Sequence, residues 1–423
     1  MTFRFVHAAD LHLDTPFEGL RRLSPLVAEA AQDASLDAFD ALVALAIDRG
    51  AAFVLFAGDI YDGPERGTRA QIRFLRGLER LDERGIQSFV AHGNHDPVVS
   101  GWSAIRAWPP RVTVFGHQSV GSVPVEVGGK ELATVHGISF GSRAVTENLA
   151  LRFKRSGAGF QVGLLHCNVG GDPNHDLYSP CTVDDLRDFG LDYWALGHIH
   201  ARRVLHEGDP WVVYPGNLQG RSPKPSELGP KGAVIVEVDG GTAAAPEFIE
   251  LDRVRFEQVL VDIAGLGDLA DAQKALRDAG RELQQESADR SLLLRGVLTG
   301  GGPLHTDLRR EGVVKELLRS LRDEEGEVLP FVWWDRVEDV TRPEVDFDTL
   351  KGRGDFLAEV LALAEEVDAD VEARRVFAED HLANLPGARL QRLVGELPNA
   401  AGEAAWRTAV DRAVDLLLED GAA

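Results

Sequence analysis

The residues Gly93-Asn94-His95-Asp96 follow a mainly apolar run at 86–91 and come directly before Pro97. The apolar run is typical of a short buried strand, and proline cannot continue the hydrogen-bond ladder of a sheet. An amide, an imidazole and a carboxylate therefore stand in a row where a strand ends. Since ligands of open α/β sheets bind at that edge, this stretch predicts a layered α/β fold with a polar site.

The rest of the first half alternates apolar runs of strand length with amphipathic stretches of helix length. The predicted strands cover 3–8, 53–56 and 86–91, and the predicted helices cover 36–49 and 70–84. Further along, a hairpin with a Gly-Gly turn is predicted at 123–135, followed by strands at 162–165, 192–196, 211–214, 233–238 and 247–251. A sheet sandwich flanked by helices accounts for both patterns.

The remainder of the chain predicts further domains. A boundary falls near 253–256, and the following strand and helix patterns indicate a small β-α-β-α-β module. We therefore predict an α/β protein: a layered β-sandwich core with flanking helices at 1–253, a small α+β capping domain at 254–342, and an acidic helical C-terminal region at 343–423.

Composition narrows the class of protein. The 423 residues carry a formal net charge of −23, which argues against binding nucleic acid with the whole surface. No apolar run approaches the roughly 20 residues of a membrane span, and the first residues do not resemble an export signal. The cysteines, Cys167 and Cys181, cannot form a disulfide framework. We therefore expect a cytoplasmic protein that does not enter membranes.

Side chains that bind metal ions stand at five predicted strand ends. Within the pairs at 10/12 and 198/200, a spacing of two places both side chains on one side of an extended chain. Carboxylate, amide and imidazole ligands favour Mn, Fe, Zn or Mg over Cu(I). A pair of ions about 3.5–4 Å apart needs this many ligands, including a shared carboxylate. The candidate ligands are Asp10, His12, Asp59, Asn94, His166, His198 and His200.

The order of these motifs resembles the calcineurin-like metallophosphoesterases. The motifs are Asp-x-His at 10–12, Gly-Asp-x-x-Asp at 58–62, Gly-Asn-His-Asp at 93–96, the lone His166, and Gly-His-x-His at 197–200. A finer resemblance to SbcD-type nucleases and their YhaO-like DNA repair exonuclease relatives is carried by 7–14, 192–200 and 214–221. The resemblance covers roughly residues 1–340.

The resemblance implies a role for each motif residue. Asp59 would bridge the two ions. His95 would act as the general acid toward the leaving oxygen, with Asp96 holding its ring, and a bridging water would be the nucleophile. One ion would be bound by Asp10, His12, Asp59 and His200, and the other by Asp59, Asn94, His166 and His198.

Two further observations concern substrate. Many SbcD-type nucleases carry a histidine three residues after the shared aspartate, but this chain has Asp62, which replaces a possible cation with a negative charge. Arg143 and Arg221 lie in or near matching motifs and are candidates for contacts to the DNA backbone; a solvated surface position is the alternative for each.

The resemblance implies hydrolysis of DNA phosphodiester bonds in repair, 3′ to 5′ as an exonuclease with some endonuclease capability, and Mn²⁺ as the best activator. It also implies an SbcC-type coiled-coil ATPase as partner, bound by the C-terminal helices, and a possible homodimer. Two alternatives stay open: a small-molecule phosphodiesterase, and an ATPase-binding scaffold with weak hydrolysis. The module at 256–340 favours the DNA enzyme, because a small substrate would not need it.

Overall fold

The structure is a computed structural model. It describes residues 2–18, 24–63, 67–99, 103–172, 176–287, 290–324, 329–343 and 347–382, together with 406–407, 409–414 and 417. The chain forms two compact units. The first comprises Met1–Glu257, Leu283–Leu294 and Glu325–Asp335, and the second comprises Gln258–Glu282, Arg295–Glu324 and Arg336–Ala423.

One sheet of the first unit has the strand order β12-β11-β1-β2-β3-β4, with β13 paired to β11. Strands β1 to β4 are parallel, and β11 runs antiparallel to β1. The parallel arrangement places the ends of β1, β2 and β3 at the same edge. The strands are β1 (Phe3–Ala8), β2 (Phe53–Ala57), β3 (Gln87–Ala91), β4 (Val112–Val114), β11 (Gly232–Asp239), β12 (Thr242–Ala243) and β13 (Glu247–Glu250).

The other sheet of this unit has the order β5-β6-β7-β8-β10-β9. Strands β6, β7, β8 and β10 are parallel, while β5 and β9 pair antiparallel at the two edges. The predicted hairpin is confirmed, since Gly128 and Gly129 both adopt positive φ between β5 and β6. The strands are β5 (Gly121–Val127), β6 (Lys130–Gly137), β7 (Phe160–His166), β8 (Tyr193–Gly197), β9 (Arg203–His206) and β10 (Trp211–Tyr214).

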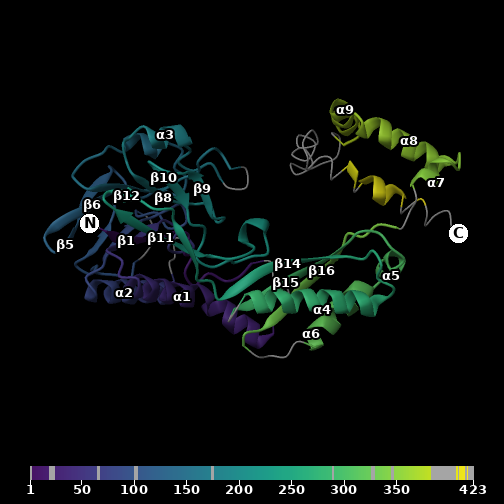
Figure 1. Cartoon of the computed structure of the whole chain (residues 1–423), viewed down its shortest axis with the longest axis horizontal. Helices are drawn as coiled ribbons and strands as arrows, with labels where there is room; N and C mark the ends of the chain where they lie inside the picture. The colour runs from purple at the N-terminus through teal and green to yellow at the C-terminus, as the bar shows by residue number, and fades with distance from the viewer. Residues whose placement is uncertain are drawn as a thin grey trace. The chain divides into compact units, whose positions relative to one another are not determined.

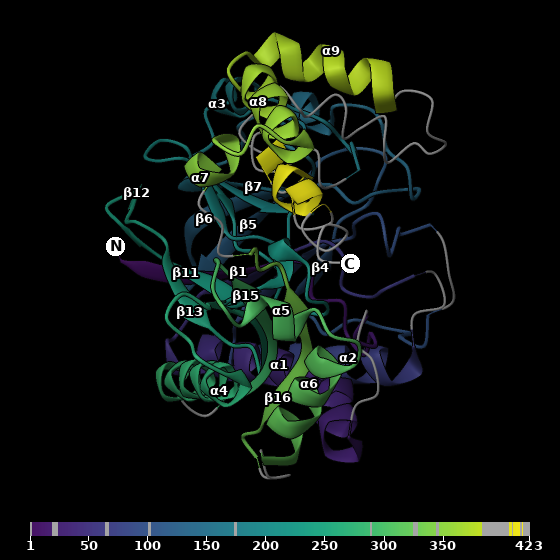
Figure 2. The ribbon, with the colours of Figure 1, turned by 90° about the vertical axis from the view of Figure 1, so that its right-hand side faces the viewer.

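The two sheets stack face to face, and α1 (Pro25–Asp48) and α2 (Thr68–Glu83) cover the outer face of the first (Figures 1 and 2). Side chains alternate between the two faces of each strand, so one strand contributes both to the core between the sheets and to the core under the helices. In β2, Phe53 and Leu55 join the core between the sheets, whereas Val54 and Phe56 pack with the helices. Short helices η1 (Leu149–Arg152) and α3 (Val183–Arg187) contribute to a third core on the second sheet. The predicted sandwich with flanking helices is confirmed.

Helix α1 is longer than the predicted helix at 36–49. It begins at Pro25, and the Ser24 side chain accepts a hydrogen bond from the Val27 N–H. Serine at the N-cap and proline at the first helical position are both favourable helix starts. The added turns bury Val27 and Ala34 with Phe256 in a separate apolar cluster.

A separate sheet has the order β14-β15-β16, and each of its strands contributes residues to both units. Helices α4 and α6 run beside this sheet (Figure 1). The α+β character of this region and the helical character of the described C-terminal residues agree with the predicted fold class; the boundaries at 254–342 and 343–423 stay predictions. The elements are β14 (Val254–Asp262), α4 (Leu269–Glu286), β15 (Ser291–Thr299), α5 (His305–Leu308), α6 (Val313–Glu324), β16 (Val332–Asp339), α7 (Phe347–Lys351), α8 (Phe356–Asp368) and α9 (Val371–Leu382).

Among the described helices, none combines the length and the apolar character that crossing a membrane requires.

Candidate metal centre

The predicted ligands meet where the parallel strands of the two sheets end. Asp10, Asp59 and Asn94 follow β1, β2 and β3, while His166 ends β7 and His198 follows β8. The registers of β1 with β2, β2 with β3 and β7 with β8 bring these ends level. All seven predicted ligands except His200, which is partly exposed, are buried.

A first group is formed by Asp10, His12 and His200, whose ligand atoms lie within 4.8 Å of one another. The Nδ1–H of His200 donates to Glu227 Oε1 at 2.6 Å, so Nε2 is the ring nitrogen on the side of the other ligands. That Nε2 lies 3.3 Å from His12 Nε2. Two nitrogens that share a tetrahedral ion with bonds of roughly 2.0–2.1 Å lie about 3.3–3.4 Å apart, so the observed separation fits one ion.

A second group is formed by Asp10, Asp59 and His166. The Nδ1–H of His166 donates to the Ala57 carbonyl at 3.0 Å, so its Nε2 carries a lone pair. This Nε2 lies 2.9 Å from Asn94 Oδ1 and 3.4 Å from Asp59 Oδ2. Three acceptor atoms that converge in a buried place repel one another unless a cation lies among them, and the arrangement therefore fits a second ion.

The carboxylate of Asp59 belongs to the second group and also lies near His12 of the first, while Asp10 is common to both groups. Its Oδ2 is 3.4 Å from His166 Nε2 and 3.9 Å from His12 Nε2, while its Oδ1 accepts from the His95 backbone N–H at 2.9 Å. One oxygen atom thus faces imidazoles of both groups, which is the geometry required of a bridging ligand.

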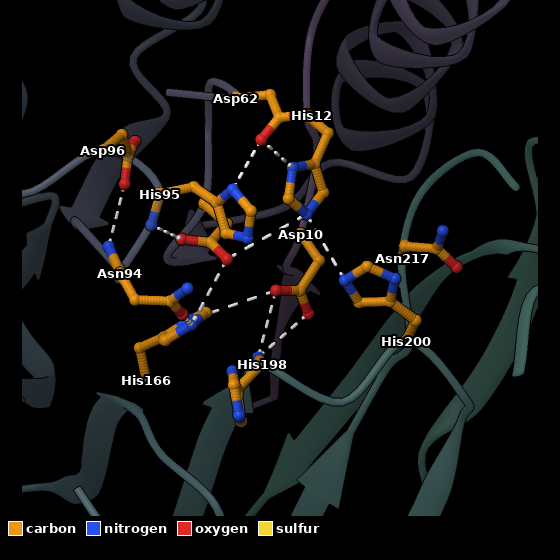
Figure 3. Close-up of polar contacts among 12 residues, drawn as sticks. Asp10, His12, Asp62, Asn94, His95, Asp96, His166, His198, His200 and Asn217 are labelled. Carbon is orange, nitrogen blue, oxygen red and sulfur yellow. Dashed lines mark hydrogen bonds and ion pairs between the residues drawn. The ribbon is translucent and has the colours of Figure 1, made fainter. Parts of the chain in front are cut away.

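His198 contributes its backbone to the centre. Its N–H donates to both Asp10 oxygens at 3.0 Å, and its Nε2 lies 2.9 Å from the Asp176 carbonyl. In Figure 3 the His198 side chain extends away from the Asp10 carboxylate. The structure therefore brings His198 to the centre without turning its ring into either group, and its role as a ligand stays a prediction.

Four of the predicted ligands have left-handed backbone conformations. The φ angles are 50° for Asp10, 41° for His12, 50° for Asp59 and 105° for His198. Such conformations cost on the order of 1–3 kcal/mol each for residues other than glycine, and they gather at functional sites. The surrounding sheets hold these residues in costly geometry, which supports a functional role for the place where they meet.

Burial shapes the electrostatics of the centre. Burial, with the neighbouring Asp59, raises the pKa of Asp10 well above its ordinary value, and burial raises the pKa of Asp59 to about 6. Burial likewise lowers the pKa of His12, and lowers that of His166 to about 4. Buried carboxylates beside neutral imidazoles are a donor set that divalent cations compensate, so the residues present fit two ions.

His95 faces this centre and is held by Asp62. Its Nδ1 lies 2.5 Å from Asp62 Oδ1, and its ring centroid is 5.0 Å from that of His12 (Figure 3). Arg221 Nη1 donates to the other Asp62 oxygen at 3.0 Å. Burial lowers the pKa of His95, but Asp62 and Asp59 outweigh it and the pKa is raised overall. The hydrogen bond with His95 helps to lower the pKa of Asp62 to about 2.

The His95 ring is paired with Asp62, and the predicted role of Asp96 in holding that ring stays a prediction. Asp96 accepts from the backbone N–H groups of Ile60 at 3.0 Å and Gly93 at 2.9 Å, and it pairs with His92 Nδ1 at 2.9 Å. It therefore shapes the loops that carry Asp59 and Asn94. Asp62, which the sequence marked only as a departure from the nuclease pattern, is the carboxylate that orients His95.

The two candidate substrate residues differ in their surroundings. Arg221 is largely buried, with its guanidinium against Asp62. Arg143 is exposed on the loop after β6 and lies close enough to Tyr178 for their charges to interact. The Tyr178 ring in turn lies 5.8 Å from the His198 ring. Contacts of either arginine with substrate stay predictions.

Sequence reasoning missed Glu227. Its carboxylate accepts a hydrogen bond from His200, and the residue is only 4% exposed. The motif at 214–221 pointed to the adjoining loop, but no spacing in the sequence marks a carboxylate that meets its histidine across 27 residues.

Gly93 leaves no room for a side chain beside the centre. A Cβ atom there would collide with Asp59 Oδ1 and lie 2.8 Å from His166 Nε2. We expect Gly93→Ala to displace Asp59 and His166, to lower stability by about 1–3 kcal/mol and to weaken Mn²⁺ binding. Thermal melting and calorimetric titration check this. Gly116→Ala is the matched control, since its methyl group would meet no described atom within 4 Å; equal behaviour of the two variants would contradict the prediction.

Comparison with known proteins identifies families that match this chain. Residues 3–202 match the family described as Calcineurin-like phosphoesterase, and residues 256–342 match the one described as Metallophosphoesterase YhaO, middle domain. The chain is 36% identical over 351 residues to the Bacillus subtilis (strain 168) protein named Uncharacterized metallophosphoesterase YhaO, covering 82% of this chain and 84% of that protein.

More distant relatives carry the name DNA double-strand break repair protein Mre11. The protein of Aeropyrum pernix is 26% identical over 285 residues, which cover 64% of this chain and 66% of that protein. The protein of Haloferax volcanii is 26% identical over 414 residues, which cover 94% of this chain and 83% of that protein. The resemblance expected from the sequence is confirmed. The chain belongs to the calcineurin-like phosphoesterase family, which uses a dinuclear divalent metal site, and it is a metal-dependent hydrolase of phosphoester bonds.

Proposed function

We propose that this hydrolase acts on the phosphodiester bonds of DNA as a 3′ to 5′ exonuclease with some endonuclease capability, in DNA repair. We base the proposal on the two ligand groups, which have Asp10 in common and each place an imidazole near Asp59 Oδ2, and on the adjacent His95–Asp62 pair. The names of the Mre11 relatives and the match of 256–342 to a YhaO middle domain support DNA over a compact ester.

The proposed ligand sets contain the members of the two groups together with Asn94 and His198. A bound ion pair, with Mn²⁺ the expected best activator and Fe, Zn or Mg as alternatives, supplies positive charge for the phosphate oxygens and acidifies water as the nucleophile. Asp59 would be shared by the two ions. Asp10, His12, Asp59 and His200 would hold one, and Asp59, Asn94, His166 and His198 would hold the other.

The chain's own residues handle the proton of the leaving group. Asp62 holds Nδ1–H of His95, so that the proton on Nε2 can pass to the leaving sugar oxygen. The negative charge of Asp62 stabilises the protonated ring, and Arg221 fixes Asp62 in place from the other side. The buried walls around Asp10 and His12 exclude bulk water and strengthen these interactions.

End-labelled linear DNA tests the substrate class. We expect Mn²⁺-dependent release of nucleotides from 3′ ends, loss of the activity in EDTA, and its recovery when Mn²⁺ is restored, because the charge for phosphate comes from the ions. Denaturing gels follow DNA, and bis-p-nitrophenyl phosphate in the same buffer reports the centre independently of DNA binding. Cleavage of the small ester with no cleavage of any DNA would favour the small-molecule phosphodiesterase.

We further propose the division into a nuclease domain at 1–253, a capping and DNA-binding domain at 254–342, and an ATPase-binding region at 343–423 in a cytoplasmic protein. The helices α8 and α9 of that last region would bind an SbcC-type coiled-coil ATPase. Co-purification with such an ATPase, compared between the full chain and a chain that ends at 342, tests the partner. Size-exclusion chromatography with light scattering tests the homodimer.

A further inference from the structure

The carboxylate of Glu227 joins three parts of the centre. Glu227 closes the short helix η2 (Pro225–Glu227), in the segment between β10 and β11. Its Oε1 accepts from His200 Nδ1 at 2.6 Å. Its Oε2 accepts from Asn217 Nδ2 at 2.7 Å and from the Arg221 backbone N–H at 3.1 Å. One buried side chain thus holds a predicted metal ligand together with the segment that carries the cation facing Asp62.

A buried lysine ties the same two segments together through their backbones. Lys231 Nζ donates to the His200 carbonyl at 2.9 Å and to the Ser226 carbonyl at 2.6 Å, and the residue is 5% exposed. The segment at 226–227 is therefore linked to His200 twice, once through the imidazole and once through the backbone. Such links restrict both the position and the rotation of the His200 ring.

We propose that Glu227 is the positioning residue that orients His200 for metal binding and, through Arg221, places the partner of Asp62. This inference rests on the proposed function, because it takes His200 as a ligand. A carboxylate that accepts from the distal ring nitrogen of a ligating histidine fixes its tautomer and increases its basicity. Removal of such a partner costs about 10–100-fold in metal affinity.

The hydrogen-bond donors around Glu227 make the substitution Glu227→Gln a direct test of its role. The three groups at its oxygens, His200 Nδ1–H, Asn217 Nδ2 and the Arg221 N–H, are all donors. In Glu227→Gln the side-chain NH2 group would therefore face at least one of these donors, and that pair could not form a hydrogen bond. We expect this variant to bind one Mn²⁺ with wild-type affinity and the other about 10–100-fold more weakly, as measured by calorimetric titration of the full chain.

Two further variants separate positioning from general destabilisation. Glu227→Asp keeps the charge on a shorter side chain and should bind the weakened ion with intermediate affinity, which also provides a measurement if Glu227→Gln does not fold. Asp252→Asn is the matched control, since Asp252 is a buried carboxylate paired with Arg255 and Arg290. It should melt at a lower temperature while both ions bind as in the wild type.

The outcomes distinguish this inference from the proposed function. A wild-type chain that binds no Mn²⁺ would overturn both. A wild type that binds two ions, with Glu227→Gln and Glu227→Asp doing the same at equal affinity, would overturn the role of Glu227 alone. Equal weakening by Asp252→Asn would also overturn it, because the loss would then follow stability. Selective weakening of one ion in the Glu227 variants supports it.

Discussion

Asp59→Asn is expected to lose the binding of at least one Mn²⁺ and to slow hydrolysis of bis-p-nitrophenyl phosphate by roughly 10²–10⁴-fold. The Asp59 carboxylate faces imidazoles of both ligand groups, at 3.4 Å from His166 Nε2 and 3.9 Å from His12 Nε2. Two neighbouring cations repel each other, and a shared negative charge offsets that repulsion. That change in rate corresponds to a loss of about 3–5 kcal/mol of transition-state stabilisation.

The Asp59→Asn experiment needs proof that the variant is folded. Burial raises the pKa of Asp59 to about 6, so the stability that the protonated carboxyl contributes is lost as the pH rises through that value. Without metal at pH 8, the neutral amide should therefore melt no lower than the wild type. Metal content after dialysis and hydrolysis rates are then compared with Asp184→Asn, whose side chain is 88% exposed. Two bound ions and full activity in Asp59→Asn would refute the shared role.

His95→Asn is expected to lower kcat by about 10²–10⁴-fold, the usual contribution of a general acid, while leaving two Mn²⁺ bound. Its ring is held by Asp62 and its backbone N–H by Asp59, and neither of the two ligand groups that contain Asp10 includes His95. Asp62→Asn should cause a smaller loss, because the ring remains but loses its orientation and its stabilising charge. Rates at saturating Mn²⁺, with metal content as the control, check both effects.

The double variant decides whether Asp62 acts through His95. Residues that work as one unit have non-additive effects, so Asp62→Asn combined with His95→Asn should be no slower than His95→Asn alone. Additive losses would show that Asp62 acts on the reaction by another route. A large loss of bound metal in His95→Asn would contradict its assignment as the proton donor and make it a ligand.

The sequence by itself determined the layered fold and the polar residues at its edge. Local sequence shows that apolar runs of strand length come before Asp10, Asp59 and Asn94. Parallel pairing then brings the ends of these strands to one edge of the sheet, independently of the conformations of the loops. The chemical types of the ligands followed from the same strand ends. The start of α1 at Pro25 was missed, although Ser24 and Pro25 are themselves a local signal.

Only the tertiary structure decided which side chains support the ligands and the proton donor. Asp62 meets His95 across 33 residues, and Glu227 meets His200 across 27, through loops whose paths no spacing in the chain encodes. Asp96, next to His95 in sequence, faces backbone N–H groups, because neighbouring side chains in a turn point in different directions. Strand patterns are set by local periodicity, whereas hydrogen-bond partners depend on how distant loops pack together.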